Sequence, residues 1–479
     1  MGDLTPELAR YHEEIRELAK GYGLDFYETI FELVDSDELN MIASYGGFPR
    51  RYPHWRFGME YDQLSKSYQH GLSKIYELVI NNDPCYAYLM RSNSLLEQKL
   101  VMAHVYGHCD FFKNNYWFSK TDRKMMDTMA NHGTRIRAYM DRYGVAVVED
   151  FIDRVNSLEN LIDPCSELVE GSVQAEVDSD DAELPLAPRA DRDVLRFLMR
   201  FAPLEPWQQD VLAMLRDEAY YFVPQRMTTV MNEGWAVYWH STMMCKHILR
   251  PEELITYCGH HSGALATVPG QINPYKLGVE LMRHIERRWD KGQYGREWAS
   301  IEDAQERRNY DNAAGKGREK IFELRRDHND VSFVEQFFDE DFARDQKYYV
   351  YGRDSRSGEY VIVDRDYRKV KQQLLWGLTN FGQPRISVID ANYANRGELY
   401  LYHEWRGLDL QFQLASETLK NLHALWQRPV HLETREEGEG RLLSFDGEEL
   451  RFLRLRPSEE AFAVGQLPPD GDENLEVTP

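Results

Sequence analysis

The sequence has few cysteines, no long apolar run and a deficit of positive charge. Its 479 residues include five cysteines, an odd number with no CxxC pair, so no disulfide framework is predicted. No stretch of about 18 apolar residues occurs, which argues against a transmembrane helix. Residues 1–20 have helical periodicity and acidic side chains where a signal peptide would have an apolar core. We therefore expect a cytoplasmic protein with free thiols.

Acidic residues outnumber basic ones by 80 to 57, which gives a formal net charge of -23 at pH 7. Phosphate backbones and anionic lipid headgroups repel a chain with this charge. We therefore expect no nucleic acid partner and no docking to an anionic membrane surface. Hydrophobic residues make up 42% of the chain and aromatic residues 13%, which is enough to build the cores of two or three domains.

Apolar periodicity predicts a mainly α-helical part at residues 1–344. Within it, residues 24–34 have helical spacing, and the short apolar run at residues 85–90 is typical of a strand. Residues 166–192 are acidic, contain prolines and have few aromatics, which predicts a mobile loop. The fold class expected from this pattern is α+β, with the helical part preceding a smaller module.

That smaller module is predicted at residues 345–460, where apolar and polar residues alternate as in strands and two helical segments interrupt them. The last residues, 461–479, are rich in proline, glycine and acidic side chains. We expect them to form a disordered tail.

Two segments far apart in the chain carry side chains that commonly bind metals. In AHVYGHCDFFKNN (residues 103–115), His104 and His108 are four positions apart, which places both rings on one face of a helix. The segment MNEGWAVYWH (residues 231–240) contains Glu233. Zinc bound by two imidazoles and a carboxylate keeps one coordination position open for water. We predict these three residues to be ligands of zinc or another divalent metal; the alternative is a pair of core histidines satisfied by hydrogen bonds.

Other polar residues share the faces of the two predicted helices. Glu97 precedes the first histidine by two turns, and Asn115 follows the second by two turns. His240 follows the glutamate of the second segment by two turns. Such groups orient metal ligands, and Glu97 and His240 are also candidates for acid–base catalysis. His240 is a further candidate ligand; the alternative is a core histidine bonded to a backbone carbonyl.

The segment CGHHSGALATVPGQINPYKLG (residues 258–278) contains several glycines and is predicted to be a loop. Its His261 and Tyr275 could donate a hydrogen bond to a developing oxyanion. The alternative is a glycine-rich turn with a purely structural role.

With these motifs the chain resembles the SpoVR family, the stage V sporulation protein R-like proteins. The resemblance rests on MAHVYGHCDFFKNN, MNEGWAVYWH, PGQINPYKLG and the C-terminal α+β module, and it spans residues 5–460. It implies a cytoplasmic bacterial protein linked to formation of the spore cortex, which is peptidoglycan. For non-sporulating bacteria it implies a stress or stationary-phase role beside a PrkA-type serine kinase and a von Willebrand-like partner.

The metal motif alone is similar to that of gluzincin metallopeptidases, in which an HExxH helix supplies two ligands and a later glutamate the third. This resemblance implies His104, His108 and Glu233 as ligands and a zincin-like fold for the helical part. The peptidases place their general-base glutamate directly after the first histidine, where this chain has Val105. Amide hydrolysis therefore requires another base, such as His240 or Glu97.

Three functions follow as alternatives. The first is a metal-dependent amidase or peptidase, and the second is a non-catalytic regulatory scaffold that uses the metal for stability and works with the kinase system. The third, a carboxylate–histidine iron protein, usually has a glutamate three residues before a ligand histidine. Neither predicted ligand helix has that spacing, which disfavours the third function.

Overall fold

The chain forms two compact units, each made of two segments of the sequence. The first unit is Met1–Arg137 with Tyr221–Gly382, and the second is Ala138–Tyr220 with Gln383–Pro479. The computed structural model describes residues 3–69, 77–166, 168, 191–267, 271–353 and 358–455. Most of the predicted acidic loop at 166–192 and all of the predicted tail at 461–479 lie outside these residues. An independently folding module at 345–460 stays a prediction.

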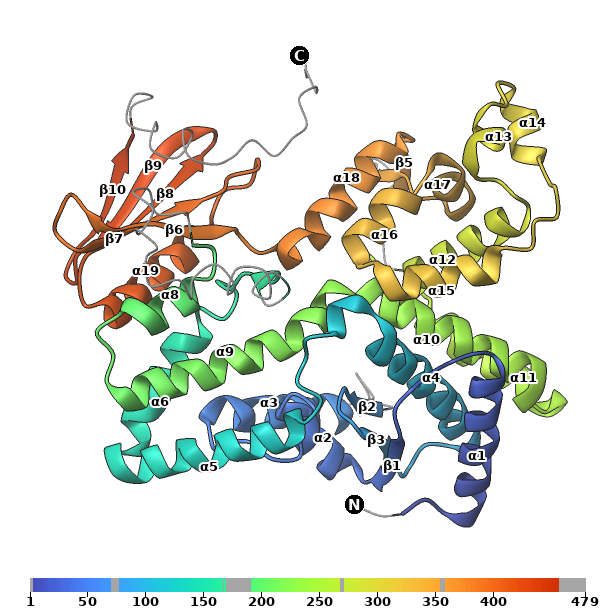
Figure 1. Cartoon of the computed structure of the whole chain (residues 1–479), viewed down its shortest axis with the longest axis horizontal. Coiled ribbons are helices and arrows are strands. Elements are labelled where there is room, and N and C mark those ends of the chain that lie inside the picture. The colour runs from blue at the N-terminus through green and yellow to red at the C-terminus, as the bar shows by residue number, and fades with distance from the viewer. Residues whose placement is uncertain are drawn as a thin grey trace, which may run out of the picture. The chain divides into compact units, whose positions relative to one another are not determined.

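The first unit is mainly helical (Figure 1). Its helices are α1 (Pro6–Gly21), α2 (Ser36–Ser44), α3 (Trp55–Gln69), α4 (Leu95–Asn114), η1 (Tyr116–Phe118), α10 (Thr229–Met243), the π-helical turn η2 (Met244–Ile248), η3 (Pro251–Glu253), α11 (Leu254–Ala264), α12 (Pro274–Asp290), α13 (Gly295–Ala299), α14 (Ala304–Asn309), α15 (Gly317–Asp327), α16 (Asp330–Phe337), α17 (Glu340–Gln346), α18 (Tyr367–Leu378) and η4 (Thr379–Gly382). Its strands are β1 (Thr29–Val34), β2 (Glu77–Ile80), β3 (Cys85–Met90), β4 (Val350–Arg353) and β5 (Tyr360–Asp364). Two further helices, α5 (Met125–Tyr143) and α9 (Pro206–Met227), continue from one unit into the other.

The prediction of a helix at residues 24–34 is wrong, because Thr29–Val34 form strand β1. This strand pairs in parallel with β3, and Thr29 lies opposite Cys85. The periodicity of a short apolar run does not distinguish a helix from a strand. Here the hydrogen-bonded pairing with β3 determines that the segment is a strand. The predicted strand at residues 85–90 is confirmed as β3, the middle strand of the sheet β1-β3-β2.

Helix α4 begins with a capping box. Ser94 accepts a hydrogen bond from the backbone N–H of Glu97, and the Glu97 carboxylate accepts one from the backbone N–H of Ser94. This exchange satisfies two N–H groups at the start of the helix and defines where it begins. Most side chains of α4 are buried, as expected for a helix enclosed on several sides by other elements.

Glycines let α4, α10 and α12 approach each other closely. A Cβ atom added at Gly107 of α4 would lie 2.7 Å from the Cα atom of Ala236 in α10. On another side of α10, a Cβ atom at Gly278 of α12 would lie 2.1 Å from the carbonyl oxygen of Val230 and 2.7 Å from the Cα atom of Gly234. Helix α10 is therefore held between two helices at distances that only small residues allow (Figure 1).

The first turn of α10 is capped from another helix. The Asp330 carboxylate at the start of α16 accepts hydrogen bonds from the backbone N–H groups of Val230 and Met231, both at 2.8 Å. The cap residue itself, Thr228, makes no such bond with its side chain. Burial raises the pKa of Asp330 to about 7, although the two N–H groups favour its charged form. This contact fixes the start of the helix that carries Glu233.

A buried ion pair joins α4 to η3. The Lys99 ammonium is fully buried and lies 2.7 Å from both carboxylate oxygens of Glu253. We expect Glu253→Gln to lower the free energy of unfolding by about 2–3 kcal/mol, because a buried cation would lose its counter-charge. Urea denaturation measures this change. Glu252→Gln, at the exposed neighbouring position, should change the stability by less than about 0.5 kcal/mol, and equal effects of the two variants would contradict the prediction.

The described part of the second unit contains a five-stranded sheet of order β10-β9-β8-β7-β6. Its strands are β6 (Ile386–Tyr393), β7 (Glu398–His403), β8 (Val430–Glu436), β9 (Glu439–Phe445) and β10 (Leu450–Arg454), and its helices are α6 (Val145–Asn156), α8 (Val194–Phe201) and α19 (Phe412–Trp426). Neighbouring strands are antiparallel except for β7 and β8, which are parallel. Helix α19 packs against β8 and β9. The predicted α+β class, with a mainly helical part and a C-terminal sheet, is confirmed.

Across the described ranges, none of the helices has the length and apolar content needed to cross a membrane.

Candidate metal centre

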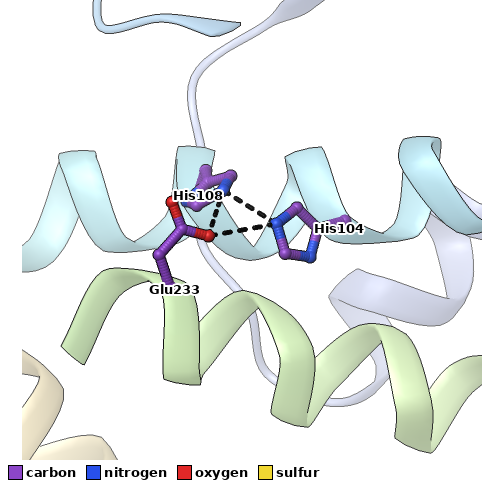
Figure 2. Close-up of side chains that lie close together, drawn as sticks. All are labelled: His104, His108 and Glu233. Carbon is purple, nitrogen blue, oxygen red and sulfur yellow. Dashed lines mark hydrogen bonds and ion pairs between the residues drawn. The ribbon is translucent and has the colours of Figure 1, made fainter. Parts of the chain in front are cut away.

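His104, His108 and Glu233 lie together in the first unit, and their ligand atoms are all within 4.8 Å of one another. The Nε2 atoms of the two histidines are 3.0 Å apart. Oε2 of Glu233 lies 3.4 Å from Nε2 of His104 and 3.6 Å from Nε2 of His108. Figure 2 shows the two rings projecting from α4 toward the glutamate of α10. The structure therefore brings the three predicted ligands to one point.

The second nitrogen of each imidazole has a partner of its own. Nδ1 of His108 lies 2.9 Å from Oδ1 of Asn232. Because an amide oxygen only accepts hydrogen bonds, Nδ1 of His108 carries the proton, and Nε2 of the neutral ring has a lone pair that faces Nε2 of His104 at 3.0 Å. Nδ1 of His104 lies 2.9 Å from Nδ1 of His240, so one of these nitrogens donates to the other. These contacts fix the orientation of both rings, as the outer contacts of metal-bound histidines do.

The electrostatic environment favours a neutral His108 beside an ionised Glu233. Burial lowers the pKa of His108 to about 4, against the opposing charge of Glu233. Burial also works against ionisation of Glu233, but its neighbours His108 and His104 and a hydrogen bond with Tyr275 outweigh burial, so its pKa is lowered. A neutral imidazole at His108 and an ionised carboxylate at Glu233 are protonation states that metal binding requires.

Three of the four predicted catalytic residues lie around this cluster. The Tyr275 ring stacks on His104 with centroids 6.3 Å apart. His240 lies behind His104, and its buried Nε2 atom has no hydrogen-bond partner among the described residues. His261 is next to His240, with ring centroids 5.8 Å apart. Burial and the neighbouring His104 lower the pKa of His240 well below its usual value.

The other two predicted neighbours are placed elsewhere. Glu97 forms the capping box at the start of α4. Asn115 ends that helix, where its Nδ2 group donates to the backbone carbonyls of Arg325 and His328. Both side chains share a helical face with the histidines in sequence spacing, but each forms these hydrogen bonds at an end of α4. Neither residue belongs to the metal-type cluster.

The prediction of a loop at residues 258–278 is wrong for its first part. Leu254–Ala264 form helix α11, which carries His261, and Tyr275 lies in the first turn of α12. The glycines at positions 259 and 263 have open space around them, so they do not impose a turn. Residues 268–270 lie outside the described residues.

Comparison with known proteins identifies the relatives of this chain. The family model described as SpoVR like protein matches residues 3–183 and 170–383, and the model described as SpoVR-like C-terminal domain matches residues 384–437. The chain belongs to the SpoVR family. The match covers both segments that supply the clustered residues, so this SpoVR protein carries His104, His108 and Glu233 within its family-defining region.

The uncharacterized protein YcgB of Escherichia coli (strain K12) is 30% identical to this SpoVR chain. The similarity covers 89% of the chain and 91% of YcgB. No solved structure matches the chain. Family membership therefore rests on sequence similarity. The arrangement of the site in this SpoVR protein is seen in its own structure.

A buried aspartate joins α4 and α10 of this SpoVR protein to each other. Asp110, two residues after His108, accepts a hydrogen bond from Nε1 of Trp235 in α10 at 2.8 Å. It also pairs with Arg325 of α15 at 3.0 Å. Burial raises the pKa of Asp110 to about 7, and Arg325 opposes that shift. Asp110 lies two residues after His108, and Trp235 lies two residues after Glu233. This hydrogen bond therefore holds α4 and α10 in register beside the cluster.

Asn232 is a site residue that sequence analysis missed, since asparagine is not a typical metal ligand and the residue's role depends on a partner in another helix. We expect Asn232→Ala to weaken zinc binding by roughly 10–100-fold, because His108 would lose the acceptor that fixes its tautomer. Competition with a chromophoric chelator measures the affinity. Asn232→Asp keeps an acceptor at this position and should bind zinc more tightly than Asn232→Ala. An unchanged affinity in Asn232→Ala would contradict the assigned contact.

Proposed function

We propose that this SpoVR protein binds a divalent metal, zinc foremost, through His104, His108 and Glu233. The observation that carries the proposal is the spacing of the three ligand atoms. Tetrahedral zinc with bonds of about 2.0–2.1 Å requires neighbouring ligand atoms to be about 3.3 Å apart, and the observed separations are 3.0, 3.4 and 3.6 Å. A cation at this point would satisfy two imidazole lone pairs and a carboxylate oxygen at once.

A histidine pair on α4 and a glutamate on the neighbouring helix α10 support a gluzincin-like site. We propose amide-bond hydrolysis as its reaction, with a peptide or a peptidoglycan-related compound as substrate. When bound, zinc supplies Lewis acidity and an activated water. Tyr275, which contacts both His104 and Glu233, is placed to donate a hydrogen bond to an oxyanion. His240 contacts the outer nitrogen of His104 and is better placed to orient that ligand than to accept a proton from water.

One observation favours a non-catalytic role as the second proposal. Val105 occupies the position of the peptidase base, and its side chain is fully buried in the core. Without a carboxylate there, the metal would stabilise the contact between α4 and α10. The protein would then act as a regulatory scaffold, with a PrkA-type kinase and a von Willebrand-like protein as proposed partners and a role in sporulation or stress.

Metal analysis followed by an activity panel separates the two proposals. Purified protein should contain about one equivalent of zinc by elemental analysis, and protein without a stoichiometric metal would contradict both. Metal-loaded protein is then incubated with peptides and muropeptides, and products are followed by mass spectrometry. Cleavage that is lost in Glu233→Ala supports the hydrolase. Bound zinc with no cleavage of any substrate supports the scaffold.

A further inference from the structure

A row of hydrogen-bonded polar side chains crosses three strands of the second unit, apart from the residues of the proposed metal site. Nδ1 of His431 on β8 lies 2.8 Å from Oγ of Ser444 on β9. On its other side, Nε2 of His431 lies 2.8 Å from Oε2 of Glu398 on β7. The strand register explains the row, because His431 lies directly opposite Ser444 and side chains opposite each other in an antiparallel pair project from the same face.

The direction of the hydrogen bonds follows from the charge on Glu398. Arg396 makes two contacts with this carboxylate, through Nε and, at 2.9 Å, through Nη2. These contacts, followed by the hydrogen bond with His431, lower the pKa of Glu398 despite its burial. An ionised carboxylate only accepts, so Nε2 of His431 donates its proton in the hydrogen bond to Glu398. Nδ1 then accepts from the Ser444 hydroxyl.

This is the arrangement of an activated serine: a hydroxyl on a base, with the base oriented by a third group. Burial decreases along the row toward the hydroxyl. Glu398 and His431 are buried, at 7% and 9% exposure, whereas Ser444 is partly exposed. The Tyr393 ring lies beside His431 with centroids 5.0 Å apart, and 4.6 Å from the ring of Tyr400. Tyr400 is buried and Tyr393 is partly exposed, so one accessible aromatic ring adjoins the row.

We propose that Ser444, His431 and Glu398 form a serine acyl-transfer site that takes ester substrates with an apolar acyl group. The Ser444 oxygen bonds to the ester carbonyl carbon while its proton moves to Nδ1 of His431. The bond from that carbon to the alcohol oxygen then breaks, and His431 returns the proton to the departing alcohol. Water releases the acyl group by the same proton path, so that ester and water give acid and alcohol. Glu398 stabilises the protonated imidazole throughout.

A fluorophosphonate probe tests this site in the full chain. The Ser444 oxygen should bond to phosphorus with release of fluoride, and mass spectrometry of a digest should place the label on the peptide containing Ser444. We expect Ser444→Ala to abolish labelling, and His431→Gln to slow it on the order of 100-fold or more. Ser387→Ala is the matched control, because Ser387 is a partly exposed serine on β6 of the same sheet.

Labelling is performed with and without EDTA, so that the result is independent of the proposed metal site. Equal labelling under both conditions is expected, and labelling that requires metal would contradict the assignment. An unlabelled wild-type protein with a native circular dichroism spectrum, or a label mapped to another residue, would overturn it. If His431→Gln fails to fold, Glu398→Gln replaces it and should also label more slowly. Because the label is mapped in the wild-type protein, the test does not depend on the stability of any variant.

Discussion

Replacing His104 by alanine is expected to weaken zinc binding on the order of 1,000-fold. Zinc contributes roughly 10–16 kcal/mol at the structural sites of zinc-finger peptides. Losing one of three protein ligands here should remove about 4 kcal/mol or more, which corresponds to that factor. The remaining pair, His108 and Glu233, would hold the ion with two ligands 3.6 Å apart. Isothermal titration of metal-free protein measures the affinity, and elemental analysis checks the content of the purified variant.

Two further variants sharpen this result. Glu233→Gln keeps the size of the side chain and removes its charge, so it should also lose most of the bound zinc. His328→Gln is the control, because His328 belongs to the same unit and contacts Gln336 and Phe337 but none of the three proposed ligands. It should retain the wild-type zinc content. Full zinc occupancy in both His104→Ala and Glu233→Gln would exclude this cluster as the binding site.

Replacing Gly278 by alanine is expected to lower the free energy of unfolding by at least about 3 kcal/mol, the upper end of the usual cost of overpacking. The new Cβ atom would lie 2.1 Å from the Val230 carbonyl oxygen and 2.7 Å from the Cα atom of Gly234. Both are backbone atoms of α10, so no side-chain rotation relieves the clash and the helices must separate. Glu233 is next to Gly234, so zinc affinity should fall with stability.

Gly259→Ala provides the matched comparison. Gly259 is also a helical glycine of the first unit, but a Cβ atom there would have nothing within 4 Å. Alanine is the better helix former, so this variant should gain about 0.5–1 kcal/mol. Urea denaturation and zinc titration of both proteins test the prediction. A Gly278→Ala variant as stable as Gly259→Ala would show that close packing at this crossing is not required.

The proposed metal site depends on helix packing, which explains why its parts differ in how well they could be predicted. The position of His104 relative to His108 depends only on helix geometry, and the capping box at Ser94 and the apolar composition of α4 indicate that helix locally. The distance of Glu233 from them depends on a contact between segments far apart in sequence. In the sequence, only the metal-binding residue types suggest that contact. In the structure, glycines at the crossings of α10 allow it.

Several other features were decided by tertiary contacts. Residues 29–34 form a strand because β3 lies beside them, although their apolar spacing also suits a helix. Asn232 became part of the site because His108 faces it across two helices. Asp330 caps α10 from about 100 positions along the chain, so no local motif could reveal it.

By itself the sequence determined the α+β class, the SpoVR resemblance, the histidine pair on one helical face and the absence of a glutamate at position 105. These features depend on composition, local periodicity and residue identity. The tertiary structure decided that Glu233 meets the two histidines, that His240 lies behind His104, and that His431 links Ser444 to Glu398. Such contacts join residues distant in sequence, and their distances are set by packing between helices and register between strands, which a local pattern does not contain.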